Sequence, residues 1–160
     1  MERRLLFLYN PFAGKGKIKT SLSDILQIFA ESGFEITVHP TMGSQDLTQT
    51  IRKEAQRFDY IVVSGGDGTL HELADGLMAL PPEQRPPCGY IPTGTVNDFA
   101  TSLEIPKQVL KAAKLAAAGQ PAFCDIGEMN GHFFTYIAGF GAFTEVAYET
   151  SQATKNALGK

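Results

Sequence analysis

Tryptophan is absent from the sequence, and cysteine occurs only twice in 160 residues. Cys88 and Cys124 lie far apart in the chain, and neither has a second ligand at metal-binding spacing. A disulfide-stabilised scaffold and a zinc site are therefore excluded. Sparse cysteine is typical of proteins of the reducing cytoplasm, and we expect a cytoplasmic location.

The sequence also lacks a strong excess of charge, since 14 basic and 17 acidic residues leave a formal net charge of −3. No overall basic field is available to attract a nucleic-acid backbone, so nucleic acid is not an expected partner. Long apolar runs are absent too. The run at residues 5–9 is far shorter than the ~18 residues of a membrane-spanning helix, so we expect any membrane contact to be peripheral.

The apolar residues that are present alternate between two patterns. A continuous apolar run predicts a buried strand at residues 4–9, and shorter strand-like segments predict strands at 34–38, 60–63 and 88–91. Apolar residues at helical spacing predict helices at 22–29, 47–55, 70–77 and 107–118. Thr20 or Ser21 is the expected N-cap of the first helix, and Ser44 that of the second. This alternation predicts an α/β fold, an open parallel sheet with helices on both faces.

The pattern changes after residue 122. Apolar and aromatic runs at 123–126 and 132–138 flank an Asn130-Gly131 pair, which favours a hairpin turn, and a helical pattern follows at 143–158. We expect residues 1–122 to form an α/β lobe and residues 123–160 to begin a truncated, antiparallel β-rich lobe. Aromatic residues left without packing partners there are expected to promote self-association as a homodimer: Phe133, Phe134, Tyr136 and Phe140.

Four loops follow the four predicted strands, at residues 10–17, 39–41, 64–69 and 92–98. In an open parallel sheet, the loops at the carboxyl ends of the strands lie side by side and hold the ligand. These loops are rich in glycine, lysine and hydroxyl side chains, which a purely structural sheet edge does not need. The sequence therefore predicts a phosphate site at this edge.

The loop at 64–69, Ser-Gly-Gly-Asp-Gly-Thr, carries most of this signal. Its glycines let backbone N–H groups approach an anion, and the following helix adds a partial positive charge. Asp67 would repel a phosphate unless a cation such as Mg²⁺ lies between them. Structural explanations stay open at this point: the glycines also suit an ordinary tight turn, and one of the polar residues at 93–98 can serve as a helix cap.

Three motifs resemble those of the diacylglycerol kinase catalytic domain, a group that includes sphingosine and ceramide kinases. They are Asn-Pro-Phe-Ala-Gly at 10–14, Ser-Gly-Gly-Asp-Gly-Thr-Leu-His-Glu at 64–72 and Pro-Thr-Gly-Thr-Val-Asn-Asp-Phe-Ala at 92–100. Their order and spacing are more specific than any one motif. The resemblance implies ATP in a cleft between two lobes, Mg²⁺, and phosphoryl transfer to a lipid hydroxyl, most directly that of diacylglycerol, at a membrane surface.

The resemblance also implies roles for individual residues. Asp67 is the implied catalytic residue and, through the nucleotide, the implied contact of Mg²⁺. The residues implied to bind the nucleotide are Asn10, Pro11, Phe12, Ala13, Gly14, Lys15, Thr41, Gly65, Gly66, Asp67, Gly68, Thr69, Leu70, His71, Thr95 and Asn97. Lys155 loosely matches a further basic residue of the family. The general base and a structural cation are expected beyond Lys160, so we expect this chain alone to be inactive.

Two alternatives stand beside this interpretation. A soluble nucleotide kinase of the NAD kinase type shares a Gly-Gly-Asp-Gly signature, and a non-catalytic nucleotide-binding module would use the same loops. The Asn10-Pro11 pair and the Thr-Val-Asn-Asp sequence at 95–98 favour the lipid kinase.

Overall fold

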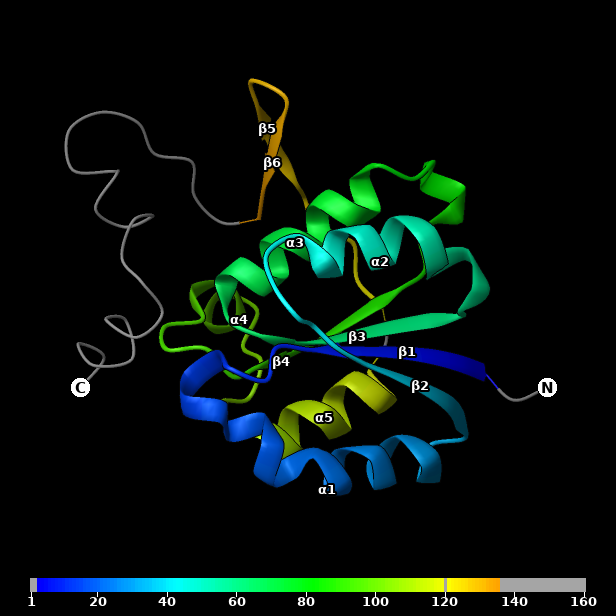
Figure 1. Ribbon diagram of the computed structural model, residues 1–160, viewed down its shortest axis with the longest axis vertical. Coiled ribbons are helices and arrows are strands. Elements are labelled where there is room, and N and C mark those ends of the chain that lie inside the picture. Colours follow the sequence, from blue (N-terminus) through cyan, green and yellow to red (C-terminus); the bar gives the residue numbers. More distant parts are fainter. Residues whose placement is uncertain (1–2, 120, 136–160) are drawn as a thin grey trace.

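The computed structural model describes residues 3–119 and 121–135. Its centre is a parallel four-stranded sheet in the order β2-β1-β3-β4 (Figure 1). The strands are β1 (Arg3–Tyr9), β2 (Phe34–Pro40), β3 (Tyr60–Gly65) and β4 (Cys88–Pro92). The helices are α1 (Lys17–Glu31), α2 (Asp46–Glu54), α3 (Asp67–Met78), α4 (Asp98–Ser102) and α5 (Val109–Ala118). The predicted α/β fold is confirmed.

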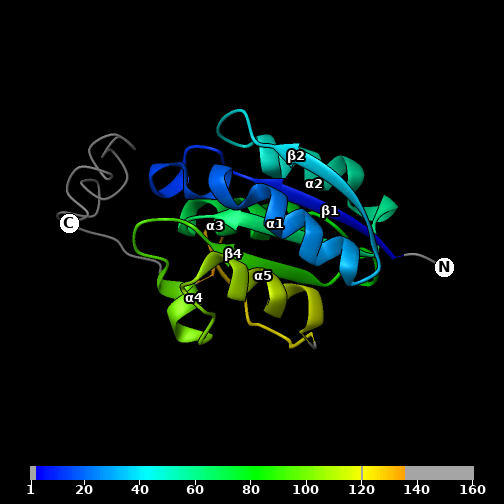
Figure 2. The same ribbon diagram turned by 90° about the horizontal axis from the view of Figure 1, so that it is seen from below.

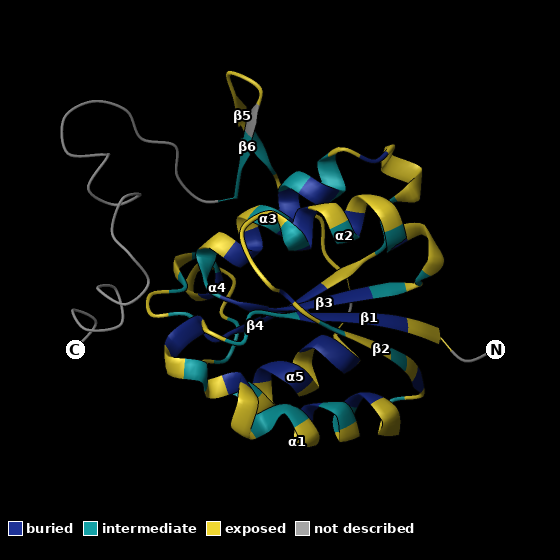
Figure 3. Ribbon diagram, in the orientation of Figure 1, coloured by how far each residue is buried: buried dark blue, intermediate teal, exposed yellow. Residues whose placement is uncertain are grey.

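Helices cover both faces of the sheet, which explains the continuous apolar runs of its strands. Helices α1 and α5 lie on one face and α2 and α3 on the other (Figures 1 and 2). Successive side chains of β1 enter opposite cores: Phe7 packs in the cluster that contains Phe29 of α1, and Leu8 in the one that contains Ile51 of α2. Strands β1, β3 and β4 are mostly buried, whereas the edge strand β2 is mostly half-buried or exposed (Figure 3).

Two helices begin at residues other than those expected. Helix α1 starts at Lys17 because Gly16, with φ of 74°, turns the chain there, and Thr20 lies inside the helix with its hydroxyl donating to Lys17 O at 3.0 Å. Helix α2 starts at Asp46, after Gln45 in a left-handed conformation. Thr20, Ser21 and Ser44 are therefore not the caps, since left-handed backbone turns take that place.

A two-stranded antiparallel sheet follows, formed by β5 (Gly127–Met129) and β6 (His132–Phe134). The predicted hairpin turn at Asn130-Gly131 is confirmed, with φ of 53° and 78°. The strand expected at 123–126 is wrong: these residues pair with no strand among those described, and Phe123 is fully exposed. Residues 136–138, Phe140, the helix expected at 143–158 and Lys155 lie outside the described residues. The lobe boundary at 122 stays a prediction.

The described helices contain no segment that is both long and apolar enough to cross a membrane.

Candidate active site

The loops after the four strands are joined by backbone hydrogen bonds at the carboxyl edge of the sheet. Asn10 N donates to Ser64 O at 2.8 Å, which connects the loops after β1 and β3. Thr41 N donates to Tyr9 O at 2.9 Å, and its buried hydroxyl lies 3.3 Å from the same oxygen. Thr93 N donates to Gly65 O at 2.8 Å. The structure thus brings together the four loops that the sequence placed side by side.

The loop after β1 folds back on itself and reaches the loop after β4. The Asn10 side-chain oxygen accepts a hydrogen bond from Phe12 N at 2.9 Å, closing a tight turn. Gly14 has φ of 51°, and a Cβ there would overlap the Thr93 carbonyl oxygen. Only glycine fits both constraints. Phe12 and Lys15 are exposed on the outer surface of this loop.

The glycine loop after β3 leads directly into α3. Gly66 is extended, with φ of −96° and ψ of −168°, and its carbonyl accepts hydrogen bonds from Thr69 N and Leu70 N. The N–H groups of Asp67 and Gly68, the first two of α3, form no backbone hydrogen bond within the described part of the chain. The sequence analysis did not foresee the packing at Gly66, where a Cβ would lie 3.3 Å from Gly94 Cα.

Asp67 is the first residue of α3 and is half-buried. Its Oδ2 accepts a hydrogen bond from Asn97 N at 3.0 Å, while its Oδ1 is buried without a partner among the described residues. A buried acceptor is normally satisfied, so this oxygen is available to a donor or a cation. No cluster of three or more metal-ligating side chains occurs in the described part of the chain, so a Mg²⁺ bound here would need further oxygen ligands.

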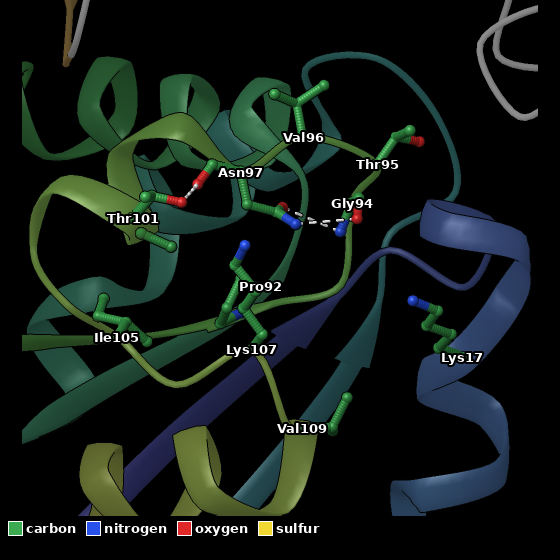
Figure 4. A pocket seen from close by; sticks show the side chains of 11 residues that line it. Lys17, Pro92, Gly94, Thr95, Val96, Asn97, Thr101, Ile105, Lys107 and Val109 are labelled. Atoms are coloured by element: carbon green, nitrogen blue, oxygen red, sulfur yellow. Dashed lines mark hydrogen bonds between the residues drawn. The ribbon is translucent and has the colours of Figure 1, made fainter. Parts of the chain in front are cut away.

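Asn97 holds the loop after β4 in place. Its backbone is left-handed, with φ of 61°, and its side chain accepts a hydrogen bond from Gly94 N at 3.0 Å and donates one to Gly94 O at 2.9 Å (Figure 4). Although Asn97 precedes α4, its side chain does not cap that helix. Because its side chain is already engaged, Asn97 positions Asp67 through its backbone N–H.

Tyr90 of β4 supports this arrangement from the core. Its buried hydroxyl lies 3.1 Å from Gly65 O and 3.3 Å from the Asn97 side-chain oxygen, two acceptors that share one proton. Burial, and to a smaller extent the charge of Asp67, raises the pKa of Tyr90. The hydroxyl therefore remains a donor at neutral pH. The sequence analysis missed Tyr90, although a tyrosine in a buried strand signals a hydrogen-bond partner.

The profile of the diacylglycerol kinase catalytic domain matches residues 4–129. The chain belongs to the diacylglycerol kinase catalytic domain family. The diacylglycerol kinase of Bacillus subtilis (strain 168) is 41% identical over 160 residues, which cover 99% of this chain and 52% of that protein. That of Staphylococcus carnosus (strain TM300) is 38% identical with the same coverage.

A crystal structure described as a diacylglycerol kinase from Bacillus anthracis str. Sterne superposes with a TM-score of 0.76 at 35% identity. The match covers 82% of this chain and 45% of that one. The chain thus spans about half the length of the relatives it matches.

In this domain of the diacylglycerol kinase family, some of the residues predicted to bind the nucleotide do not have side chains at the carboxyl edge of the sheet. Leu70 is buried in the core between the sheet and α3, so its side chain is a packing residue. His71 is exposed and lies 3.5 Å from Asp75 on its own helix. Thr69 is buried against Gly65, and Thr95 is exposed beside Asn97. The remaining predicted residues lie on the four joined loops or at the start of α3.

Proposed function

We propose that this domain binds ATP with Mg²⁺ at the carboxyl edge of the sheet and forms the nucleotide-binding part of a lipid kinase. The buried, unpartnered Oδ1 of Asp67 at the start of α3 gives the strongest support. A carboxylate beside a phosphate-binding helix terminus is unfavourable unless a cation lies between the two charges. Nucleotide-bound Mg²⁺ meets that need.

The chain's own groups suit the binding of phosphates. The N–H groups of Asp67 and Gly68, which have no backbone partner among the described residues, would donate to a phosphate, and Gly66 and Gly68 leave the approach free of side chains. Asn97, with Tyr90 behind it, holds the Asp67 carboxylate toward the same place. Bound Mg²⁺ supplies charge neutralisation between the phosphates and this carboxylate. Asn10 and Thr41 extend the proposed site along the edge toward β2, and the family resemblance places Thr41 near the nucleoside.

The proposed acceptor is a lipid hydroxyl, most directly that of diacylglycerol. This follows from membership of the diacylglycerol kinase family and from the Asn-Pro and Thr-Val-Asn-Asp motifs, which set the chain apart from the soluble nucleotide kinases. We further propose that the protein acts at the cytoplasmic surface of a membrane, where such a lipid resides. Inactivity of this chain alone and homodimer formation stay predictions.

Titration with ATP tests the proposal directly. The 160-residue chain is expected to bind Mg·ATP with a Kd between tens of micromolar and millimolar, about −4 to −6 kcal/mol, because one lobe encloses only one side of the ligand. Calorimetry with and without Mg²⁺ provides the measurement. Absence of binding at millimolar ATP, or equal affinity after removal of Mg²⁺, would contradict the proposed site.

Gly66→Val is expected to weaken nucleotide binding while leaving the fold intact. The branched side chain would stand where phosphate approaches the backbone and would press on Gly94. Loss of one charge-assisted contact reduces affinity by about tenfold or more, and circular dichroism should stay unchanged. Gly43→Val is the matched control, since a Cβ there meets nothing within 4 Å and Gly43 is not among the proposed nucleotide residues. Equal ATP affinity of the Gly66→Val variant and the parent chain would mean that the loop is only a turn.

A further inference from the structure

The loop at residues 41–45, which joins β2 to α2, is held at both of its ends (Figure 1). At the first end, the N–H and the hydroxyl of Thr41 both donate to Tyr9 O on the neighbouring strand β1. At the other end, Gln45 has a left-handed backbone with φ of 65°. A residue other than glycine keeps this unfavourable conformation only where the surrounding contacts hold it. The contacts around the loop therefore help to fix the position of Thr41.

The carboxylate of Asp46, the first residue of α2, makes the central contacts. Its Oδ2 accepts a hydrogen bond from Met42 N in the loop at 2.7 Å and lies 3.3 Å from His39 Nε2 of β2. The Thr50 hydroxyl lies 3.5 Å from the same His39 nitrogen. An ionised carboxylate only accepts hydrogen bonds, so His39 Nε2 carries the proton between the two residues. One carboxylate oxygen thus joins the strand, the loop and the helix.

Asp46 is charged at neutral pH. The Met42 N–H has the largest influence on this carboxyl and lowers its pKa, partial burial raises the pKa, and His39 lowers it again. The exposed fractions of the His39 and Asp46 side chains are 35% and 28%, so water reaches this pair less than it reaches a fully exposed ion pair. Hydrogen bonds to a charged acceptor are about twice as strong as neutral ones. The carboxylate therefore holds the loop firmly.

The position of this loop in the sheet determines which part of a nucleotide it can affect. Strand β1 lies between β2 and β3. Neighbouring strands are about 4.8 Å apart, so the loops after β2 and β3 are separated by about 10 Å. A phosphate bound at the start of α3 is thus too far from Thr41 for direct contact, whereas the nucleoside of the same ATP can span that gap. The loop after β2 lies beside the part of ATP that a bare triphosphate lacks.

We propose that His39 and Asp46 are a positioning pair that holds Thr41 in place for the nucleoside of bound ATP. Neither side chain contacts the ligand, and both act through the loop that they fix. The pair sets the preference for ATP over a triphosphate without a nucleoside. This inference rests on the proposed function, because it requires ATP at the carboxyl edge of the sheet.

Calorimetric titration of the 160-residue chain with ATP and with inorganic tripolyphosphate, each in the presence of Mg²⁺, tests the proposal. Asp46→Ala is expected to weaken ATP binding by about threefold to tenfold, the scale of one lost hydrogen bond. Its affinity for tripolyphosphate should equal that of the parent chain. His39→Ala should show the same selective loss while leaving the first residue of α2 unchanged. His39→Gln should restore ATP affinity, because a glutamine side-chain amide can also donate to Asp46.

Asp59→Ala is the matched control. Asp59 also joins a backbone N–H to a basic side chain, since it accepts a hydrogen bond from Arg4 N at 2.8 Å and lies 3.6 Å from Arg4 Nε. It precedes β3 and therefore lies at the amino edge of the sheet, opposite the proposed site. Gly43→Val is a second control, because it alters the same loop where a Cβ meets nothing within 4 Å. Both variants should bind ATP as the parent chain does.

Amide hydrogen exchange of the chain without ligand measures the position of the loop independently of ATP. Thr41 N donates to Tyr9 O and forms no hydrogen bond with Asp46. Faster exchange of Thr41 in Asp46→Ala would therefore report movement of the loop rather than the loss of its own acceptor. Asn10 N, which donates to Ser64 O, is the internal reference and should exchange at the parent rate. Asp59→Ala should leave both amides unchanged.

Three results would overturn the role of the pair while the proposed function stands. They are unchanged ATP affinity of Asp46→Ala and His39→Ala, equal losses of ATP and tripolyphosphate affinity in these variants, and unchanged exchange of Thr41. A parent chain that binds neither ATP nor tripolyphosphate would instead overturn the proposed function, and this inference with it.

Discussion

Asp67→Asn is expected to lower turnover by about a hundredfold or more in a protein of the relatives' full length, the scale of losing a key electrostatic group. Asparagine keeps the shape of the side chain but removes the negative charge that would hold nucleotide-bound Mg²⁺. The buried Oδ1, which has no partner among the described residues, is the atom whose charge matters most. Initial rates of diacylglycerol phosphorylation over a range of Mg²⁺ concentrations measure the effect.

The stability of this variant is expected to change little, for a reason visible only in the structure. The sequence analysis assigned Asp67 to the loop at 64–69, but in the structure it begins α3 and is half-buried. An asparagine oxygen can still accept the hydrogen bond from Asn97 N, so the free energy of unfolding should fall by no more than about 1 kcal/mol. Asp98→Asn is the control, because Asp98 is an exposed acid at the start of α4. Near-normal turnover of Asp67→Asn would contradict its assignment.

The sheet and its ligand edge were predictable because they depend on short stretches of sequence. A parallel strand covered on both faces is apolar at successive positions, as residues 5–8 and 61–63 are, and such runs are visible without neighbours. The loops after these strands then share one edge for topological reasons. The motifs that indicated the family were also predictable, because each one lies within a single short loop.

The positions of helix starts were less predictable. Serine and threonine near the first helical residue suggest side-chain caps, yet α1 and α2 follow Gly16 and Gln45 in left-handed conformations. Glycine permits that conformation readily, but glutamine rarely adopts it, so nothing in the local sequence indicates Gln45. The apolar and aromatic run at residues 123–126 wrongly suggested a strand. A strand needs a partner strand, and none of the described strands pairs with these residues.

The support around Asp67 could not be predicted, because it joins residues about thirty positions apart. Tyr90 reaches Gly65 O and the Asn97 side chain, and Asn97 N reaches Asp67. Each residue taken alone has an ordinary explanation: a strand tyrosine, a cap and a loop acid. Only their distances show that the loop after β4 positions the carboxylate at the start of α3.

Gly14→Ala is expected to have the largest effect on stability, because two separate costs fall on one methyl group. Gly14 has φ of 51°, where a side chain costs about 1–2 kcal/mol. The new Cβ would also overlap the Thr93 carbonyl oxygen, and relieving such an overlap costs a further ~1–3 kcal/mol. Gly33→Ala separates the two costs, because Gly33 has φ of 79° and open space around it. Chemical denaturation should show a loss for Gly14→Ala clearly above that for Gly33→Ala, together with weaker ATP binding in the Gly14 variant alone. Equal losses would mean that the loop after β1 does not press against the loop after β4, and that these two loops do not share one binding edge.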